Sequence, residues 1–413
     1  MKRLVFGVIF SFALIWLYFS TDTDLNDDQL VTQTTPTSKT KSIQAPLPVE
    51  INTNEQTLNA PTSIIESSTH NNKAPIIESD QSKPDNIENL NVTQLDIPES
   101  EHSPSFNITD PMLKQCMEYK LLVDEDEQPT MDRMLYVTRL TCNAKDLKGI
   151  EDWTQIHTLD LSVGEIKDIS PLKTLVNVTE LYLSRNKIER LNGVSEMKEL
   201  TKLTANRNNI SDLTGLSNLE NIEYLELHSN NIESLRGLSR LSSLLRLTLA
   251  NNKITDISEL AGLHNLTILD ISKNNISDLS PLSGLTNLRS LTISSNQIKD
   301  LTPLSSMSGL ITLIGEDNQI SVIDPLLNIN SLKYLNLSNN NISNIDNLNT
   351  FTQIEALLLK ENNITNIDSL TSLYQLYNLN LSGNPAIKDC EKLNFILERN
   401  GKLVCNDTQI LTN

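Results

Sequence analysis

The sequence has few of the residues from which enzyme cores and metal centres are built. Aromatic residues make up 4% of its 413 residues, so a large aromatic-rich enzyme core is not expected. Its five histidines and four cysteines leave little material for a His/Cys metal centre. Lys and Arg number 33 against 52 Asp and Glu, a formal net charge of −19. Because phosphate binding needs a basic face, this balance argues against nucleic acid as the main partner.

Catalytic motifs are also missing. The sequence contains no H-E-x-x-H, no G-x-S-x-G and no Walker-type G-x-x-x-x-G-K-[ST]. The acidic run 124–127 lacks the ligand spacing of an EF-hand, so we expect a solvated loop there rather than a calcium site. The histidines are dispersed, at His70, His102, His157, His228 and His264. We therefore expect no enzymatic activity, no metal and no cofactor.

The first 20 residues have the layout of an export signal. Lys2 and Arg3 precede an unbroken apolar run over residues 4–19, and no convincing A-x-A cleavage site follows. The positive end should stay cytoplasmic, which places everything downstream outside the cytosol. We expect a retained membrane anchor through residues 4–19, with the repeat domain periplasmic or on the cell surface. The alternative is a cleaved signal peptide, which would make the protein secreted.

Residues 21–108 change in character. They are rich in Thr, Ser, Asn, Pro and acids, with no sustained apolar periodicity. Such a composition cannot bury enough apolar surface to offset the chain entropy lost on ordering. We predict a disordered acidic stalk, with a root-mean-square reach of roughly 50 Å as a flexible coil.

A strict 22-residue repeat follows. Written as a template, the unit reads L-x-x-L-x-L-x-x-N-x-I-x-x-L-x-x-L-x-x-L-x-x, and no insertion interrupts the series. The eleven units open at Ile156, Val178, Leu200, Ile222, Leu244, Leu266, Leu288, Leu310, Leu332, Ile354 and Leu376.

The apolar positions predict a short strand and a non-helical return. L-x-L alternates with a period of two, so both leucines face one side of a strand. The later apolar residues recur every three positions, which favours a 3₁₀-like or extended segment. A single unit cannot bury its apolar face, so the units must stack around one core and form a parallel sheet. Prolines fall in the return, where a regular helix would reject them, at Pro171, Pro281, Pro303 and Pro325.

One position is asparagine in ten of the eleven units. Asparagine carries a donor and an acceptor, so a buried stack can satisfy backbone groups in the turn after each strand. The first unit has Gly164 instead, as expected beside a cap. The column is Asn186, Asn208, Asn230, Asn252, Asn274, Asn296, Asn318, Asn340, Asn362 and Asn384.

On these features the chain resembles the leucine-rich repeat proteins, specifically the 22-residue class of bacterial internalins and of a eukaryotic phosphatase regulatory subunit. The resemblance covers about residues 140–398. It implies an α/β repeat solenoid: a curved array with a parallel β-sheet on the concave face, a 3₁₀ or extended convex side and small helical caps. We expect an N-terminal cap at 109–155, repeats at 156–384 with the last unit merging into the cap, and a C-terminal cap and tail at 385–413.

Both caps contain two cysteines. Residues 110–122 place apolar side chains at helical spacing, residues 136–142 suggest a first strand, and the segment between Cys390 and Cys405 suggests a short helix and a closing strand. Four cysteines permit three pairings. Proximity within each cap favours the structural disulfides Cys116–Cys142 and Cys390–Cys405, given an exported chain.

The variable lining of the sheet is the candidate binding site. The third, fifth and seventh positions of each unit should project from the concave face. The first cluster there combines Tyr182, Tyr224, Glu226 and His228. Asp270 lies in the same lining, and a more apolar second cluster consists of Ile314, Tyr334 and Leu358. Tyrosine suits interfaces because it combines apolar area with a polar tip.

The leading hypothesis is a membrane-tethered, extracytoplasmic module without enzymatic activity that binds a protein partner on the concave face. An internalin-like secreted or surface adhesin is the alternative, weakened because no sorting sequence follows the C-terminal cap. A phosphatase-regulator-like scaffold is disfavoured by the export signal and the paired cysteines. A glycan ligand remains open.

Overall fold

The computed structural model describes residues 108–121, 134–385, 387–405 and 410–411. The expected anchor at 1–20 and the acidic run 124–127 lie outside these residues, as does the expected stalk at 21–108 apart from its last residue, Ile108, which packs against the core. The chain divides into two units, and every described residue belongs to the second, residues 92–413. In the described part of the chain, no helix is both long and apolar enough to cross a membrane.

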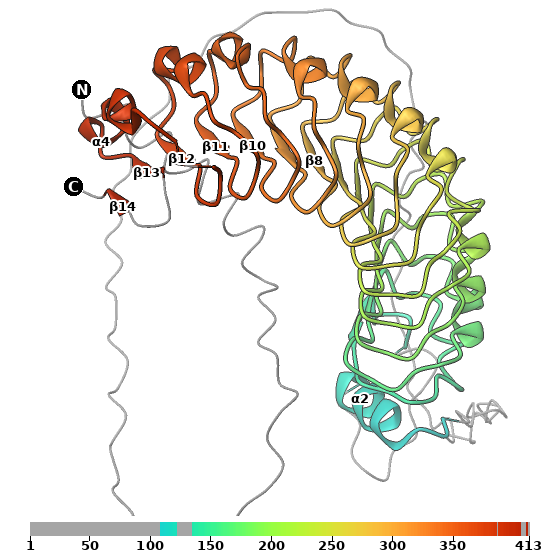
Figure 1. Ribbon diagram of the computed structural model, residues 1–413. Coiled ribbons are helices and arrows are strands. Elements are labelled where there is room, and N and C mark those ends of the chain that lie inside the picture. Colours follow the sequence, from blue (N-terminus) through green and yellow to red (C-terminus); the bar gives the residue numbers. More distant parts are fainter. Residues whose placement is uncertain (1–107, 122–133, 386, 406–409, 412–413) are drawn as a thin grey trace, which may run out of the picture. The chain divides into compact units, whose positions relative to one another are not determined.

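One 14-stranded sheet runs through the second unit, with its strands in sequence order (Figure 1). Strands β1 to β13 are parallel, and β14 pairs antiparallel with β13. From β2 to β12 the strands recur every 22 residues. They are β1 (Arg139–Thr141), β2 (Thr158–Asp160), β3 (Glu180–Tyr182), β4 (Lys202–Thr204), β5 (Tyr224–Glu226), β6 (Arg246–Thr248), β7 (Ile268–Asp270), β8 (Ser290–Thr292), β9 (Thr312–Ile314), β10 (Tyr334–Asn336), β11 (Ala356–Leu358), β12 (Asn378–Asn380), β13 (Lys402–Val404) and β14 (Ile410–Leu411).

The middle residue of each strand from β1 to β13 is a buried leucine that pairs in register with the leucine of the next strand, as Leu159 does with Leu181. These leucines join the other template positions in one continuous core. Because side chains alternate along a strand, the residues on either side of each leucine face the opposite way, onto the concave surface. The predicted stacking of the units is confirmed.

The return segments form 3₁₀ turns on the outer side of the curved repeats (Figure 1). The four prolines predicted to lie in the return stand at the first or second position of their turns. The unit that opens at Ile222 has no 3₁₀ turn, and Gly237 there adopts φ = 112°, a conformation suited to glycine. The turns cover Ser170–Thr174, Asn192–Val194, Thr214–Leu216, Ser258–Leu260, Ser280–Leu282, Thr302–Leu304, Asp324–Leu326, Leu348–Thr350, Asp368–Ser372 and Cys390–Leu393.

The asparagine column forms a hydrogen-bonded ladder inside the turns. Asn186 Oδ1 accepts the N–H of Ile166 at 3.0 Å, and its Nδ2 donates to the carbonyls of Leu161 and Leu183 at 2.9 and 3.0 Å. The acceptor bond repeats in all ten units. At Gly164 a Cβ would lie 2.7 Å from Asn186 Oδ1 and 2.5 Å from the Ala144 carbonyl, so the first unit has no room for the side chain.

The residue before the ladder position of each unit, whether that position is an asparagine or Gly164, adopts a left-handed backbone conformation, which the sequence analysis did not anticipate. The φ values at this position lie between 52° and 61° in the non-glycine residues. They are Val163, Arg185, Arg207, Ser229, Asn251, Lys273, Ser295, Asp317, Asn339 and Glu361.

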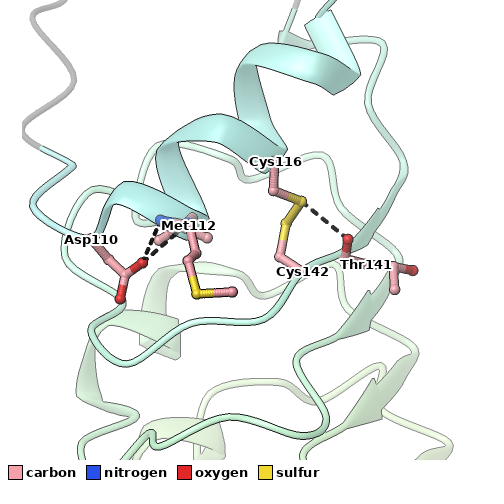
Figure 2. The surroundings of a disulfide bond; sticks show 6 residues. Asp110, Met112, Cys116, Thr141 and Cys142 are labelled. Atoms are coloured by element: carbon pink, nitrogen blue, oxygen red, sulfur yellow. Dashed lines mark hydrogen bonds between the residues drawn. A yellow bond between two sulfur atoms is a disulfide. The ribbon is translucent and has the colours of Figure 1, made fainter. Parts of the chain in front are cut away.

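The N-terminal cap consists of helix α2 (Pro111–Leu121) and β1, joined by the disulfide Cys116–Cys142 with a Cα–Cα distance of 5.9 Å (Figure 2). The predicted helix and disulfide are both confirmed. Sγ of Cys116 also lies 3.0 Å from the carbonyl oxygen of Thr141, a contact rather than a donated hydrogen bond because a disulfide sulfur carries no hydrogen.

Asp110 ties this helix to the following loop. Its Oδ1 accepts the N–H groups of Met112 and Leu113, and its Oδ2 accepts those of Lys145 and Asp146, at 2.7–3.1 Å. Burial raises the pKa of Asp110, but the four hydrogen bonds together lower it further, so the net pKa lies below its usual value.

The C-terminal cap contains α4 (Phe395–Glu398), β13 and the predicted disulfide Cys390–Cys405, with a Cα–Cα distance of 6.3 Å. Strand β14 then turns back along β13 and pairs with it over Leu403 and Val404. The closing strand was expected, but this antiparallel addition was not.

Candidate partner-binding face

The candidate residues lie on the exposed side of the sheet, and each is adjacent in sequence to a buried leucine. Tyr224 is the most open of them, with 40% of its surface exposed, and the others are half-buried. They lie on β3 (Tyr182), β5 (Tyr224, Glu226), two residues after β5 (His228), on β7 (Asp270), β9 (Ile314), β10 (Tyr334) and β11 (Leu358).

Tyr182 belongs to a three-residue contact across β3 and β4. Its hydroxyl donates to Glu180 Oε2 at 2.7 Å, and Lys202 Nζ lies 5.0 Å from the centre of its ring. Burial and the bond to Glu180 raise the pKa of the Tyr182 phenol, and Lys202 partly offsets this. The ring is therefore held in place before any partner arrives.

A second set of contacts surrounds Glu226. Its Oε1 lies 3.6 Å from Nε of Arg246, and its Oε2 accepts a hydrogen bond from Asn206 Nδ2 at 3.3 Å. Asn206 Oδ1 in turn accepts the backbone N–H of His228 at 2.9 Å. The register places Tyr224 between Lys202 and Arg246, so the corresponding position of both neighbouring strands is a cation.

Asp270 completes the charged part of the face. Its Oδ1 accepts the N–H and the hydroxyl of Ser272, at 3.0 and 2.7 Å. Burial raises the pKa of the Asp270 carboxyl, while the bonds from Ser272 and the charges of His228 and Arg246 oppose that rise. His228 and Asp270 are thus electrostatic neighbours although they belong to units two repeats apart.

The second cluster is more apolar. Ile314 and Leu358 flank Asn336 in the sheet register, and Asn336 donates to Glu316 Oε2 at 2.6 Å. Tyr334 stands beside Ala356, which is fully buried although it faces the concave side. Burial and the nearby Glu316 raise the pKa of Tyr334.

Sequence reasoning missed Tyr377 beside this cluster. Burial, Glu355 and Tyr334 raise the pKa of the Tyr377 phenol to about 12, so the two tyrosines are neighbours. Tyr377 occupies the second position of its unit, outside the three columns considered. Lys202, Asn206 and Arg246 stand in those columns, and their pairing became evident only from the strand register.

The polar groups around His228 are already engaged with other side chains. Nδ1 of His228 lies 3.2 Å from Ser229 Oγ, but that hydroxyl also accepts from Asn251, and Asp270 Oδ1 is engaged by Ser272. Among the described residues, no group of three or more His, Cys, Asp or Glu could hold a metal ion. The projecting aromatic, aliphatic and paired charged side chains form one continuous surface along the sheet.

Comparison with known proteins places the repeats in a family. Models of leucine-rich repeats match residues 242–284 and 264–306 as two copies each, and a single-repeat model matches residues 331–351. No curated protein sequence matches the chain.

Solved structures extend the likeness over the array. An internalin of Listeria monocytogenes, InlF, is 31% identical with a TM-score of 0.61, covering 70% of this chain and 93% of the internalin. The plant peptide hormone receptor RGFR1, solved with RGF2, is 19% identical (TM-score 0.55; 61% of this chain, 44% of the receptor). A TDR receptor is 22% identical (TM-score 0.53; 61% and 49%). The likeness to the two receptors concerns the fold alone.

The internalin alignment spans nearly the whole of that relative at an identity that establishes common family membership. It agrees with the 22-residue period, the parallel sheet and the asparagine ladder. The chain belongs to the leucine-rich repeat proteins, in their internalin-like class.

Proposed function

We propose that the repeat domain is a non-catalytic protein-binding module whose partner docks on the concave face. The observation that carries this proposal is the pair of clusters that project from one continuous sheet, each centred on tyrosine. Their side chains are held by contacts such as Tyr182–Glu180 and Asn336–Glu316, which lowers the entropy lost on binding. The open Tyr224 and the half-buried Tyr334 provide apolar area with a polar tip.

The cap disulfides and the N-terminal sequence support a location outside the cytosol. Disulfides persist in oxidising compartments, so the two cap disulfides favour a domain outside the cytosol. They also disfavour the alternative of a cytosolic phosphatase-regulator-like scaffold. We propose that residues 4–19 tether the chain to the membrane and that residues 21–108 act as a stalk.

A surface adhesin is the second candidate. The likeness to an internalin favours it. An adhesin would recognise a protein on another cell, whereas the tethered module would recognise one within its own envelope. Both use the same concave face, so the source of the captured partner separates them.

The test compares two triple variants of the intact chain. One carries Tyr182→Ala, Tyr224→Ala and Tyr334→Ala. The control carries Tyr119→Ala, Tyr136→Ala and Tyr374→Ala, three exposed tyrosines outside the strands. Each chain is crosslinked to its surroundings, once in its own envelope and once with intact foreign cells, and the crosslinked proteins are identified by mass spectrometry.

We expect one predominant protein to be crosslinked by the wild type and the control and to be lost with the concave-face variant. Equal crosslinking by all three chains would reject the concave face as the site. Thermal melting of each chain checks that the half-buried tyrosines were removed without unfolding.

A further inference from the structure

A polar groove lies on the return side of the first units, away from the concave face. It consists of two adjoining depressions, of about 490 Å³ and 730 Å³, which share Glu189. Both volumes fall in the range of small-ligand sites. The groove depends on residues that neither cluster of the concave face uses.

Three cations line the smaller depression. Lys167 and Lys173 come from the first unit and Arg190 from the second. All three side chains are exposed. They approach from two neighbouring return segments, so a group bound between these segments would meet positive charge from both sides.

Arg190 departs from the rule of its column. At this position most units have an acid or an amide that accepts the N–H two residues later, as Asp168 does from Ser170 at 2.8 Å. The same bond recurs in later units. Over the first ten units Arg190 is the only cation in the column, which reads Asp168, Arg190, Asp212, Ser234, Asp256, Asp278, Asp300, Val322, Asn344 and Asn366; the eleventh unit, which merges into the C-terminal cap, has Lys388.

The carboxylates of the smaller depression do not cancel this charge. Asp168 is engaged by both the N–H and the hydroxyl of Ser170. With Glu189 it makes two carboxylates against three cations, so the depression keeps a formal net charge of +1 in a chain of net charge −19. Gly193 forms part of its wall, and a Cβ there would collide with the carbonyl oxygen of Ile169.

The larger depression adds neutral hydrogen-bonding groups beside Glu233 and Lys253, an ion pair at 3.9 Å whose charges offset each other. Asn209 and Asn231 are exposed, and their side-chain amides bond to no other described residue. Their sequence neighbours Asn208 and Asn230 are buried in the ladder with both amide atoms bonded. Free amides beside Ser211 and Ser234 offer paired donors and acceptors of the kind that sugar hydroxyls require.

We propose that this groove binds an anionic polysaccharide. A sulfate, phosphate or carboxylate substituent is held by Lys167, Lys173 and Arg190, and the adjoining sugar hydroxyls bond to Asn209 and Asn231. The site is independent of the concave face, so one chain can hold a polysaccharide and a protein partner together.

The test is a calorimetric titration of the full chain at 150 mM salt with a sulfated hexasaccharide prepared from heparin. Maltohexaose, a neutral chain of the same length, and inorganic sulfate are the comparison ligands. One variant carries Lys167→Ala and Arg190→Ala. The matched control carries Lys299→Ala and Arg399→Ala, two exposed cations distant from the groove.

We expect saturable binding of the sulfated hexasaccharide only, weakened about tenfold in the groove variant and unchanged in the control. Glu189→Gln should tighten binding about two- to threefold, because it removes the opposing charge. The concave-face tyrosine variant should bind the sulfated hexasaccharide like the wild type. The polysaccharide site can therefore be tested whether or not a protein binds the concave face.

Three outcomes would overturn the proposal. Equal weakening in the groove and control variants would indicate general charge attraction. Inorganic sulfate that binds as tightly as the hexasaccharide would indicate an ion site rather than a polysaccharide site. Weaker binding by Glu189→Gln would place the anion elsewhere.

Discussion

At the scale of single residues, the array depends on side chains that satisfy backbone groups. Asn274 illustrates this: it accepts the N–H of Ile254 and donates to the carbonyls of Leu249 and Ile271. In ordinary surface turns, water hydrogen-bonds to the free backbone N–H and carbonyl groups, but here these groups are buried between units. In the ten units that have it, the asparagine therefore supplies hydrogen-bond partners that water cannot.

Asn274→Ala should lower the free energy of unfolding by about 3 kcal/mol, because it leaves a buried N–H and two carbonyls with fewer partners. Urea denaturation measures the change. Asn275→Ala is the control, since this neighbouring side chain is exposed and bonds to no described residue; it should change stability by less than about 0.5 kcal/mol. Equal losses in the two variants would contradict a special role for the ladder.

Val163→Asn should raise the free energy of unfolding by about 1 kcal/mol. Val163 has φ = 61°, and a β-branched side chain is strained in this region, which asparagine tolerates. The melting temperature reports the gain. Val176→Asn serves as the control, because Val176 is also exposed but has no positive φ, and it should bring no gain.

At the scale of the element, the caps combine a disulfide with local hydrogen bonds. Open ends of a solenoid expose core residues, and α2 covers one end with Leu113, Met117 and Leu121. Asp110 fixes the start of that helix and the loop at 145–146 with one carboxylate. Its ionisation should therefore govern the stability of the N-terminal cap.

Asp110→Asn should lower stability at pH 7 by about 2 kcal/mol, in the range of helix N-cap losses. The folded pKa of Asp110 lies below its unfolded value, so its contribution is full above the unfolded pKa and is lost as pH falls through the folded pKa. Melting curves of wild type and variant should accordingly converge once the pH has fallen below the folded pKa of Asp110. A constant gap, or the same behaviour in the exposed Asp152→Asn, would argue against this role.

Removing the C-terminal disulfide with Cys390→Ser and Cys405→Ser should cost about 3 kcal/mol, since it closes a loop of sequence separation 15. Because units contact only their neighbours, the loss should concentrate in the last units. Hydrogen exchange should quicken near α4 and β13 and stay unchanged near β4. Uniformly faster exchange along the array would contradict a local cap.

At the scale of the whole molecule, every repeat pairs with its neighbours in the same strand register. Consecutive strands pair residue for residue at a spacing of 22, from β2 to β12. The core continues through every unit without a break. The array should therefore accept the loss of a complete unit and reject the loss of part of one.

Deleting residues 266–287 should leave a folded array, because Leu263 and Leu288 then restore the template without a shift. The urea m value should fall in proportion to the surface removed. Deleting 266–276 alone breaks the register and should prevent cooperative folding. Circular dichroism and size-exclusion chromatography compare the two; a folded half-unit deletion would contradict the argument.

Most of the fold could be predicted because its information is short-range. The L-x-L strand, the asparagine and the three-residue spacing of the return recur within 22 residues, and stacking follows from them. A second ladder escaped notice: Asn177, Asn221, Asn265 and Asn287 each donate to a carbonyl 23 residues earlier. Only four of the eleven units have asparagine at this last position, so the column is weak in sequence.

The candidate site was predictable only as a set of columns. The sequence locates Glu226 and Arg246, but their ion pair depends on parallel register and on the direction of each side chain. Likewise, Tyr377 lies close enough to Tyr334 for the two phenols to interact electrostatically, although they belong to units two repeats apart. Binding by either cluster stays a prediction.

The sequence by itself determined the period, the parallel order, the buried ladder and the pairing of cap cysteines, because each depends on residue spacing or on neighbours within a cap. Only the tertiary structure decided four further features: the left-handed backbone of the residue before each ladder position, the added strand β14, the ion pairs on the concave face and the groove beside Arg190. The physical reason is that these features arise between units, where the distance between side chains depends on how one return segment packs against the next.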